Sequence, residues 1–221
     1  MTNTVVVTGA NRGIGLALCE AYRDRGDDVI ALCRQANEAL FSLGVKVIDN
    51  VDVTHTESIQ HAARALAENS IDILVNNAGV LSYEKFGQIN FDSVMKQFQV
   101  NGLGALRVSE AFAGNMRFGG KIALITSRMG SITDNTSGGY YGYRMSKAAL
   151  NAGGKSLAID LKPSGIAVAL LHPGFVQTEM VNKAGDISPE EAATRLLERI
   201  DELNLENSGT FWHSNGEVLP W

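Results

Sequence analysis

The stretch Thr4-Val-Val-Val-Thr-Gly-Ala-Asn-Arg-Gly-Ile-Gly15 decides the fold of this 221-residue chain. Its first five residues are apolar or β-branched and predict a short buried strand. Three glycines follow at once, and helical periodicity then continues as far as Gly26. A strand, a glycine turn and a helix N-terminus together bring backbone N–H groups close to a dinucleotide pyrophosphate. The spacing Gly-x-x-x-Gly-x-Gly is wider at its first gap than the common fingerprint, so a plain strand–helix turn stays an alternative.

The rest of the chain alternates short apolar runs with helical patterns, which predicts a parallel sheet. Polar motifs follow the ends of several expected strands, and ligands of open parallel sheets bind at that edge. We therefore predict one α/β domain over residues 1–221, a doubly wound (Rossmann), mostly parallel seven-stranded sheet with helices on both faces. Six of its strands are expected at residues 4–8, 28–33, 45–49 with 52–53, 71–75, 121–126 and 166–171.

The end of the second expected strand bears on which dinucleotide binds. A carboxylate there would accept hydrogen bonds from the adenosine ribose of NAD, whereas an arginine suits a 2′-phosphate. Cys33 and Arg34 stand at this place, and Arg12 lies in the glycine loop. Two guanidiniums without a competing carboxylate favour NADPH, because arginine binds phosphate through paired donors. The alternative is that both are ordinary surface arginines.

Tyr143 and Lys147 are four residues apart and would share one face of a helix. A phenol beside an ammonium is a proton-donor site, because the positive charge lowers the pKa of the phenol towards neutral pH. Ser127 follows directly on an expected strand, at the edge of the sheet where ligands bind. The sequence therefore predicts a site that donates a proton to a substrate oxygen.

These motifs together resemble the short-chain dehydrogenase/reductase family, in its single-domain branch. The matching pieces run from Thr8 to Thr178. The long segment from Ser127 to Tyr143 and the ending Gly216-Glu-Val-Leu-Pro-Trp221 are similar to the C-factor/sniffer-type carbonyl reductases within it. The resemblance implies NADPH-dependent reduction of an aldehyde or ketone to an alcohol by hydride transfer. Oxidation of an alcohol is the same reaction in the reverse direction.

The resemblance also implies a role for each matching residue. Tyr143 would be the general acid, and Lys147 would lower its pKa and bind the nicotinamide ribose. Ser127 would hold the substrate oxygen, while Asn101 would support Lys147 through a water molecule. The implied cofactor contacts are Gly9, Asn11, Arg12, Gly13, Ile14, Arg34, Asp52, Val53, Asn77, Ala78, Gly79, Tyr143, Lys147, Pro173, Gly174, Val176 and Thr178.

The spacing between serine and tyrosine departs from the family pattern, in which the gap is a few residues shorter. Ser131, with a gap of twelve to Tyr143, is therefore a second candidate. We prefer Ser127 because it stands directly at the end of the expected strand. Tyr140 and Tyr141 are alternatives to Tyr143, but neither is followed by a lysine four residues later.

Composition argues against several other classes of protein. A net charge of −5 without a basic run makes nucleic acid an unexpected partner. We find no signal sequence and no apolar stretch of membrane-spanning length, so we expect a cytoplasmic protein without membrane contact. Cys19 and Cys33 form no metal or redox motif and the four histidines are scattered, so we expect reduced thiols and no metal site.

Three loops are expected to surround the substrate: residues 128–142 and 81–86 as walls, and 175–185 as a lid. So short a lid suggests an open pocket and a small or extended carbonyl substrate. The helix near Tyr143 is rich in small residues, and in the resembling family it joins the helix near 103–112 in a two-fold contact. We expect a homodimer through these helices, with a tetramer as an option. A different class of function, an NADP(H)-binding redox sensor with little turnover, stays open.

Overall fold

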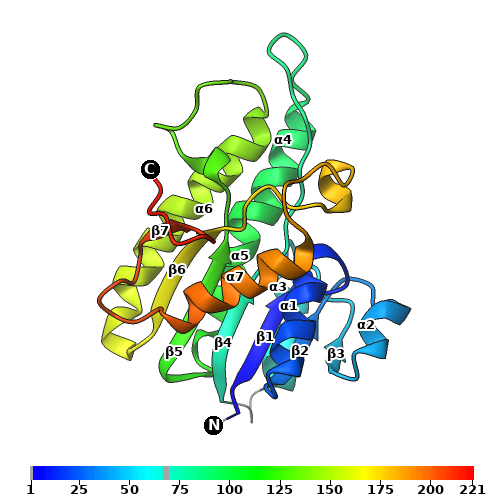
Figure 1. The fold of residues 1–221 in the computed structure, drawn as a ribbon, viewed down its shortest axis with the longest axis vertical. Coiled ribbons are helices and arrows are strands. Elements are labelled where there is room, and N and C mark those ends of the chain that lie inside the picture. Colours follow the sequence, from blue (N-terminus) through cyan, green and yellow to red (C-terminus); the bar gives the residue numbers. More distant parts are fainter. Residues whose placement is uncertain (1, 67–69) are drawn as a thin grey trace.

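The computed structural model describes residues 2–66 and 70–221 and contains a seven-stranded, fully parallel sheet (Figure 1). The strand order is β3-β2-β1-β4-β5-β6-β7. This arrangement confirms the predicted doubly wound α/β class. The strands are β1 (Thr4–Thr8), β2 (Asp28–Leu32), β3 (Lys46–Ile48), β4 (Ile71–Asn76), β5 (Met116–Ile125), β6 (Ala167–His172) and β7 (Phe211–His213).

Helices cover both faces of the sheet (Figure 1). One face carries α1 (Gly13–Asp24), α2 (Glu38–Ser42) and α7 (Pro189–Asp201). The other carries α3 (Thr56–Ala65), α4 (Phe91–Gln97), α5 (Ala105–Ala113) and α6 (Tyr141–Asp160). A π-helical segment, Phe98–Gly104, joins α4 to α5 without a break. Short 3-10 turns occupy Arg128–Gly130, Lys162–Ser164 and Glu179–Val181.

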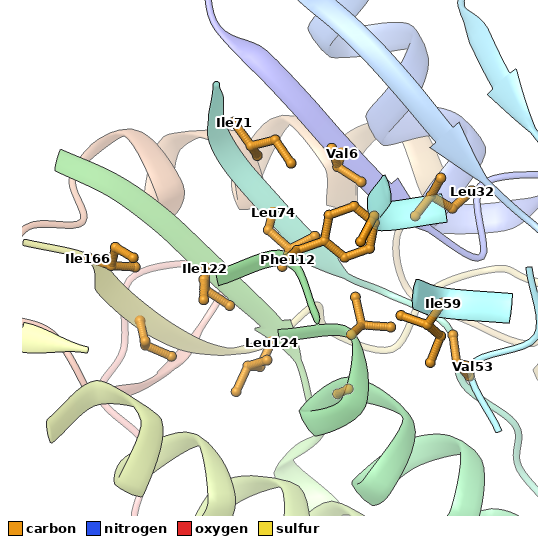
Figure 2. Close-up of a cluster of buried hydrophobic side chains, with 14 of the residues drawn as sticks. Val6, Leu32, Val53, Ile59, Ile71, Leu74, Phe112, Ile122, Leu124 and Ile166 are labelled. Carbon is orange, nitrogen blue, oxygen red and sulfur yellow. The ribbon is translucent and has the colours of Figure 1, made fainter. Parts of the chain in front are cut away.

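Alternate side chains of each strand enter one of two hydrophobic cores. On the face of α3, α5 and α6, Leu74 and Ile122 pack with Phe112 and Ile59 (Figure 2). The odd-numbered neighbours, such as Val75, pack under α1 and α7 on the opposite face. This division follows from the two-residue period of a strand. Each fully buried large apolar side chain contributes roughly 1.5–3 kcal/mol, so both cores hold the strand ends in fixed positions.

Most observed strand limits lie within one residue of the predicted ones, and the larger differences concern the third, fifth and seventh strands. The third strand ends at Ile48, and Asn50 turns the chain with a φ of 56°, so Asp52 and Val53 lie in a loop. The fifth strand begins five residues early, at Met116. The seventh strand, which no sequence pattern located, is only three residues long, Phe211–His213.

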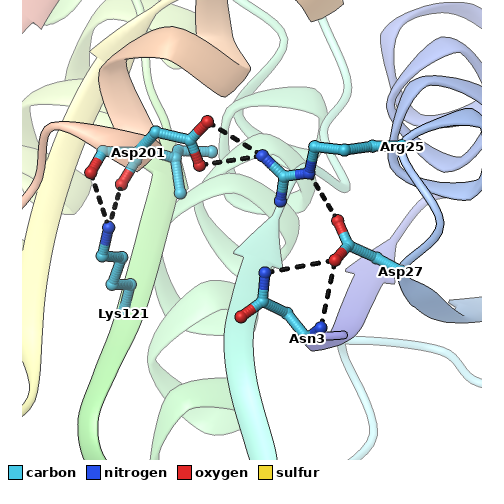
Figure 3. A network of polar contacts seen from close by, with 6 residues as sticks. Asn3, Arg25, Asp27, Lys121 and Asp201 are labelled. Atoms are coloured by element: carbon cyan, nitrogen blue, oxygen red, sulfur yellow. Dashed lines mark hydrogen bonds and ion pairs between the residues drawn. The ribbon is translucent and has the colours of Figure 1, made fainter. Parts of the chain in front are cut away.

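A polar network ties the sheet together at the edge opposite the predicted site (Figure 3). Arg25 binds the carboxylates of Asp27 and Asp201, and Asp27 accepts hydrogen bonds from Asn3. The Lys121 ammonium donates to the carbonyls of Ile200 and Asp201 at 2.8 Å each. A cation placed on the last carbonyls of a helix satisfies groups that have no partner within that helix. The network therefore anchors the end of α7 to β5.

Candidate active site

A cleft of about 1440 Å³ lies at the carboxyl ends of the strands and runs from the glycine loop to the start of α6. All the residues expected to contact a cofactor line it, together with Ser127. Asn101 is the exception among the expected residues, because it is buried behind the cleft wall. The predicted residues in the lining are Gly9, Asn11, Arg12, Gly13, Ile14, Arg34, Asp52, Val53, Asn77, Ala78, Gly79, Ser127, Tyr143, Lys147, Pro173, Gly174, Val176 and Thr178.

The turn after β1 requires its glycines. Gly9 has a φ of 64°, and a Cβ there would lie 2.9 Å from the Cα of Ala78. A Cβ at Gly15 would lie 2.5 Å from the side-chain nitrogen of Asn77. Glycine alone permits both the conformation and the close approach, so the backbone of this loop stays open to the cleft.

Thr8 is a site residue that the sequence reasoning left out. Its hydroxyl accepts hydrogen bonds from the backbone N–H groups of Asn77 and Ala78, at 3.0 and 3.1 Å. The Asn77 side chain donates in return to the carbonyl of Thr8, at 3.0 Å. These bonds hold the ends of β1 and β4 against each other. The only sequence signal for this role was the position of Thr8 at the end of the first strand. Its partner Asn77 lies about seventy residues away, so the contact itself could not be predicted.

The far end of the cleft gathers the groups expected around an adenosine. Arg12 and Arg34 both line it, and no acidic residue follows β2 directly. Burial alone would raise the pKa of the Asp52 carboxyl, but hydrogen bonds from the backbone and hydroxyl of Thr54 outweigh it and lower that pKa. Arg12 also forms an ion pair with Glu179, which the sequence did not suggest.

Tyr143 and Lys147 lie at the other end, on the first two turns of α6, and both are buried. The Lys147 ammonium donates to the carbonyl of Ile125 at 2.8 Å and lies 5.8 Å from the centre of the Tyr143 ring. Ser127 follows β5 and lines the same end of the cleft, where its hydroxyl accepts a hydrogen bond from Met129 N at 3.1 Å. The structure thus brings the three expected side chains together.

The pKa of Tyr143 differs in direction from the sequence-based expectation. Burial raises the pKa of the phenol, although the hydroxyl of Ser127 acts in the opposite direction. Burial also lowers the pKa of Lys147 to about 8. The expected lowering of the Tyr143 pKa by Lys147 is therefore wrong for this structure. The physical reason is that desolvation disfavours the charged form of both buried groups, while the ammonium is directed at the carbonyl of Ile125.

Asn101 sits in the π-helical segment and bonds to two different parts of the site. Its side chain exchanges two hydrogen bonds of 2.8 Å with the backbone of Val80 and donates a third, of 2.9 Å, to the hydroxyl of Ser146. Single π turns occur frequently at functional sites. Asn101 thereby fixes the chain after Gly79 to α6, and Ser146 is a second residue that sequence reasoning missed.

The two candidate serines have different surroundings. The hydroxyl of Ser131 donates to the carbonyl of Trp221 and accepts from Asp134 N, both at 3.1 Å, and it lies outside the cleft lining. Ser127 lies within that lining. Of the alternative tyrosines, Tyr140 lines the mouth of the cleft while Tyr141 does not. This geometry favours Ser127 with Tyr143.

The loops expected as walls and lid all contribute to the cleft. Tyr83 and Tyr140 meet edge to face at its mouth, with ring centres 4.8 Å apart, and Phe175 and Met180 belong to the lid side. Burial lowers the pKa of His172 to about 3, helped by the nearby His213, so this lining imidazole is neutral.

Three further observations concern residues 2–66 and 70–221. None of their helices is long and apolar enough to cross a membrane. Within these ranges no group of three or more His, Cys, Asp and Glu side chains is placed to hold a metal ion. Cys19 and Cys33 are free and buried.

Known proteins resemble this chain along its whole length. It matches the family described as short chain dehydrogenase over residues 3–188. It is 41% identical to the 1-hydroxy-2-glutathionyl-2-methyl-3-butene dehydrogenase of Rhodococcus sp. (strain AD45), over 99% of this chain and 100% of the relative. It is 42% identical to the C-signal of Myxococcus xanthus, over 72% of this chain and 99% of the relative.

The crystal structure of NADPH-bound carbonyl reductase from chicken fatty liver superposes with a TM-score of 0.91 at 27% identity, covering 100% of this chain and 99% of that one. The chain therefore belongs to the short-chain dehydrogenase/reductase family.

Proposed function

We propose that this protein is a cytoplasmic, NADPH-dependent carbonyl reductase that converts an aldehyde or ketone to an alcohol. The observation that carries the proposal is that Ser127, Tyr143 and Lys147 line the same cleft as the glycine loop. A protein that only binds a dinucleotide needs the loop but not the three side chains. The two free, buried thiols suit a reducing compartment.

The residues of the cleft fit a phosphorylated dinucleotide. Glycines 9, 13 and 15 leave the backbone of the turn open, and α1 directs its N-terminus at that turn. Arg12 and Arg34 supply positive charge where a 2′-phosphate would lie, and Cys33 stands in the place of the carboxylate that suits NAD. NADPH-bound chicken carbonyl reductase, with the same fold, supports this assignment.

The cofactor contacts in this proposal are those expected from the family. They are Gly9, Asn11, Arg12, Gly13, Ile14, Arg34, Asp52, Val53, Asn77, Ala78, Gly79, Tyr143, Lys147, Pro173, Gly174, Val176 and Thr178. The bound cofactor would supply the hydride, and the protein supplies position and electrostatics.

Tyr143 is the proposed acid, which gives its proton to the carbonyl oxygen as negative charge develops there. The hydroxyl of Ser127 would donate a second hydrogen bond to that oxygen, where a donor lowers the barrier most. Lys147 would hold the nicotinamide ribose of the cofactor. Asn101 keeps the chain around Gly79 fixed to α6, so that Lys147 stays directed into the site.

Turnover tests this proposal directly. NADPH oxidation would be followed by its absorbance with a panel of aldehydes, ketones and diketones, and NADPH binding would be measured separately by fluorescence. We expect turnover of at least one carbonyl and tighter binding of NADPH than of NADH. Tight NADPH binding without turnover of any carbonyl or alcohol would favour a redox sensor instead, a possibility motivated by the relative named C-signal.

The 41% identical relative is named as a dehydrogenase of a hydroxyl compound that carries a glutathionyl group. Alcohol oxidation is therefore the second candidate for the physiological direction. It is tested by NADP⁺ reduction with primary and secondary alcohols, with glutathione conjugates among them. Faster oxidation than reduction at equal concentrations, at neutral pH, would favour it.

We further propose that the protein is a homodimer. Some small residues of α6 are used internally, because a Cβ at Gly153 would meet Leu106 and one at Gly154 would meet Leu124. Another stripe of α6 stays exposed, from Met145 through Ala152 to Ile159. Light scattering across a dilution series should give a dimer mass, and Ala152→Glu should lower it to that of a monomer.

A further inference from the structure

Glu84 is a buried carboxylate that joins two parts of the cleft wall. Only 2% of its surface is exposed. Its Oε1 accepts hydrogen bonds from the Gln97 side-chain amide at 2.6 Å and from the Ser93 hydroxyl at 3.1 Å. Its Oε2 accepts one from the backbone N–H of Gly142 at 3.1 Å. These three donors replace the water that a carboxylate loses on burial.

The bond to Gly142 places this carboxylate at the N-terminus of the catalytic helix. The residue that precedes α6, Tyr140, caps the helix with no side-chain hydrogen bond of its own. Glu84 supplies the missing acceptor from 58 residues earlier in the chain. A negative charge there also interacts favourably with the positive end of the helix dipole. The first turn of α6, which carries Tyr143, is thus oriented by a residue of another loop.

Backbone hydrogen bonds also join the loop around Glu84 to the start of α6 and to α4. Its carbonyl accepts a hydrogen bond from Tyr140 N at 3.0 Å, while the oxygen of the Gln97 side chain accepts one from Ser82 N at 2.9 Å. Tyr140 is held in the left-handed region, with a φ of 51°, a conformation that costs energy outside glycine. A Cβ at Gly142 would lie 2.5 Å from the Gln97 amide nitrogen, so a side chain at position 142 would displace Gln97.

We propose that Glu84 is a positioning residue for the reaction. Its carboxylate fixes the first turn of α6, and with it the direction of the Tyr143 hydroxyl, relative to the wall loop of residues 81–86. This inference rests on the proposed function. Displacement of a reacting group by about 1 Å can lower a rate by roughly a hundredfold. The hydrogen bonds of Glu84 should therefore affect turnover and leave cofactor binding unchanged.

The test compares Glu84→Ala with the double variant Glu84→Gln/Gln97→Glu. The double variant exchanges the amide and the carboxylate between the two positions. The amide introduced at position 84 can then donate to the carboxylate at position 97 and still accept from Gly142 N. We expect Glu84→Ala to lower kcat about ten- to a hundredfold while the Kd for NADPH stays within about twofold. The exchanged pair should recover most of the lost kcat. Lys85→Ala, at the exposed neighbouring position, is the matched control and should keep full activity.

Several outcomes would overturn the inference. Unchanged kcat in Glu84→Ala would remove the positioning role, and so would a kcat loss matched by an equal loss of NADPH affinity, since that indicates general destabilisation. If Glu84→Ala does not fold, failure of the exchanged pair to recover kcat decides against the role. Absence of turnover in the unmodified protein would overturn the proposed function itself, which separates the two failures.

Discussion

The guanidinium of Arg12 lies 3.2 Å from the carboxylate of Glu179, so an ion pair joins the glycine loop to the segment that follows β6. The same two segments touch again beside it, where a Cβ at Gly13 would lie 3.3 Å from the methyl group of Thr178. If Arg12 binds the 2′-phosphate of NADPH, Glu179 competes with that phosphate for the same cation.

Glu179→Gln should therefore bind NADPH about two- to fivefold more tightly, with NADH affinity unchanged. The pair is largely exposed, at 66% and 69% of its side chains, and such pairs contribute at most about 1 kcal/mol. Fluorescence titration with both cofactors measures the effect. Glu190→Gln, at an exposed carboxylate in the first turn of α7, makes the same change in charge and should alter neither affinity. Tighter binding of NADH and NADPH alike would contradict competition at the 2′-phosphate.

Tyr143→Phe should lower kcat about a hundred- to ten-thousandfold, the range that general acid catalysis contributes. The substitution keeps the buried ring and removes only the hydroxyl, so the fold and NADPH binding should be retained. Circular dichroism and NADPH titration provide the control, and NADPH oxidation gives the rate. A variant that keeps most of its kcat would exclude Tyr143 as the acid.

A comparison of Ser127→Ala with Ser131→Ala should show which serine hydroxyl acts in the reaction and which one stabilises the fold. Loss of the Ser127 hydroxyl should lower kcat about a hundredfold or more, as removal of an oxyanion donor does. Loss of the Ser131 hydroxyl removes bonds to Trp221 and Asp134, and should cost about 1 kcal/mol of stability with little change in kcat. Steady-state rates and urea unfolding on both variants are sufficient. A larger kcat loss in Ser131→Ala would reverse the assignment.

The buried ammonium of Lys147 predicts a pH dependence of stability. Burial lowers its pKa from 10.5 to about 8, so between these values the unfolded chain binds more protons than the folded one. Stability from this group therefore rises with pH. Relative to Lys147→Met, the cofactor-free protein should gain about 1.5 kcal/mol of unfolding free energy between about pH 8 and pH 9.5. Urea unfolding across that range measures it, and parallel curves for the two proteins would show that the pKa is not lowered.

Local patterns were enough to predict the fold and most of the proposed site. The β1–glycine–α1 unit and the polar residues after β4, β5 and β6 depend on neighbours in sequence, and parallel strands then gather them at one edge. Gly142 lies 58 residues from Glu84, and Arg12 lies 167 residues from Glu179, so no local period reveals these two contacts. The seventh strand has three residues and no pattern of its own. The direction of the Tyr143 pKa depends on burial, which only the folded chain defines.

The π-helical segment Phe98–Gly104 sets the angular phase between two stretches of one continuous helix. A π turn holds about one residue more than an α turn, and each residue of an α-helix advances by about 100°. The segment therefore advances less per residue, and α4 and α5 remain parts of one continuous helix although the chain between them is longer. Gln97 and Asn101 are four residues apart on it and both face α6, which they reach through Glu84 and Ser146. An insertion or deletion inside the segment would change which residues stand at these two positions. The register of this helix is therefore a geometric constraint on the site, independent of which side chains fill it.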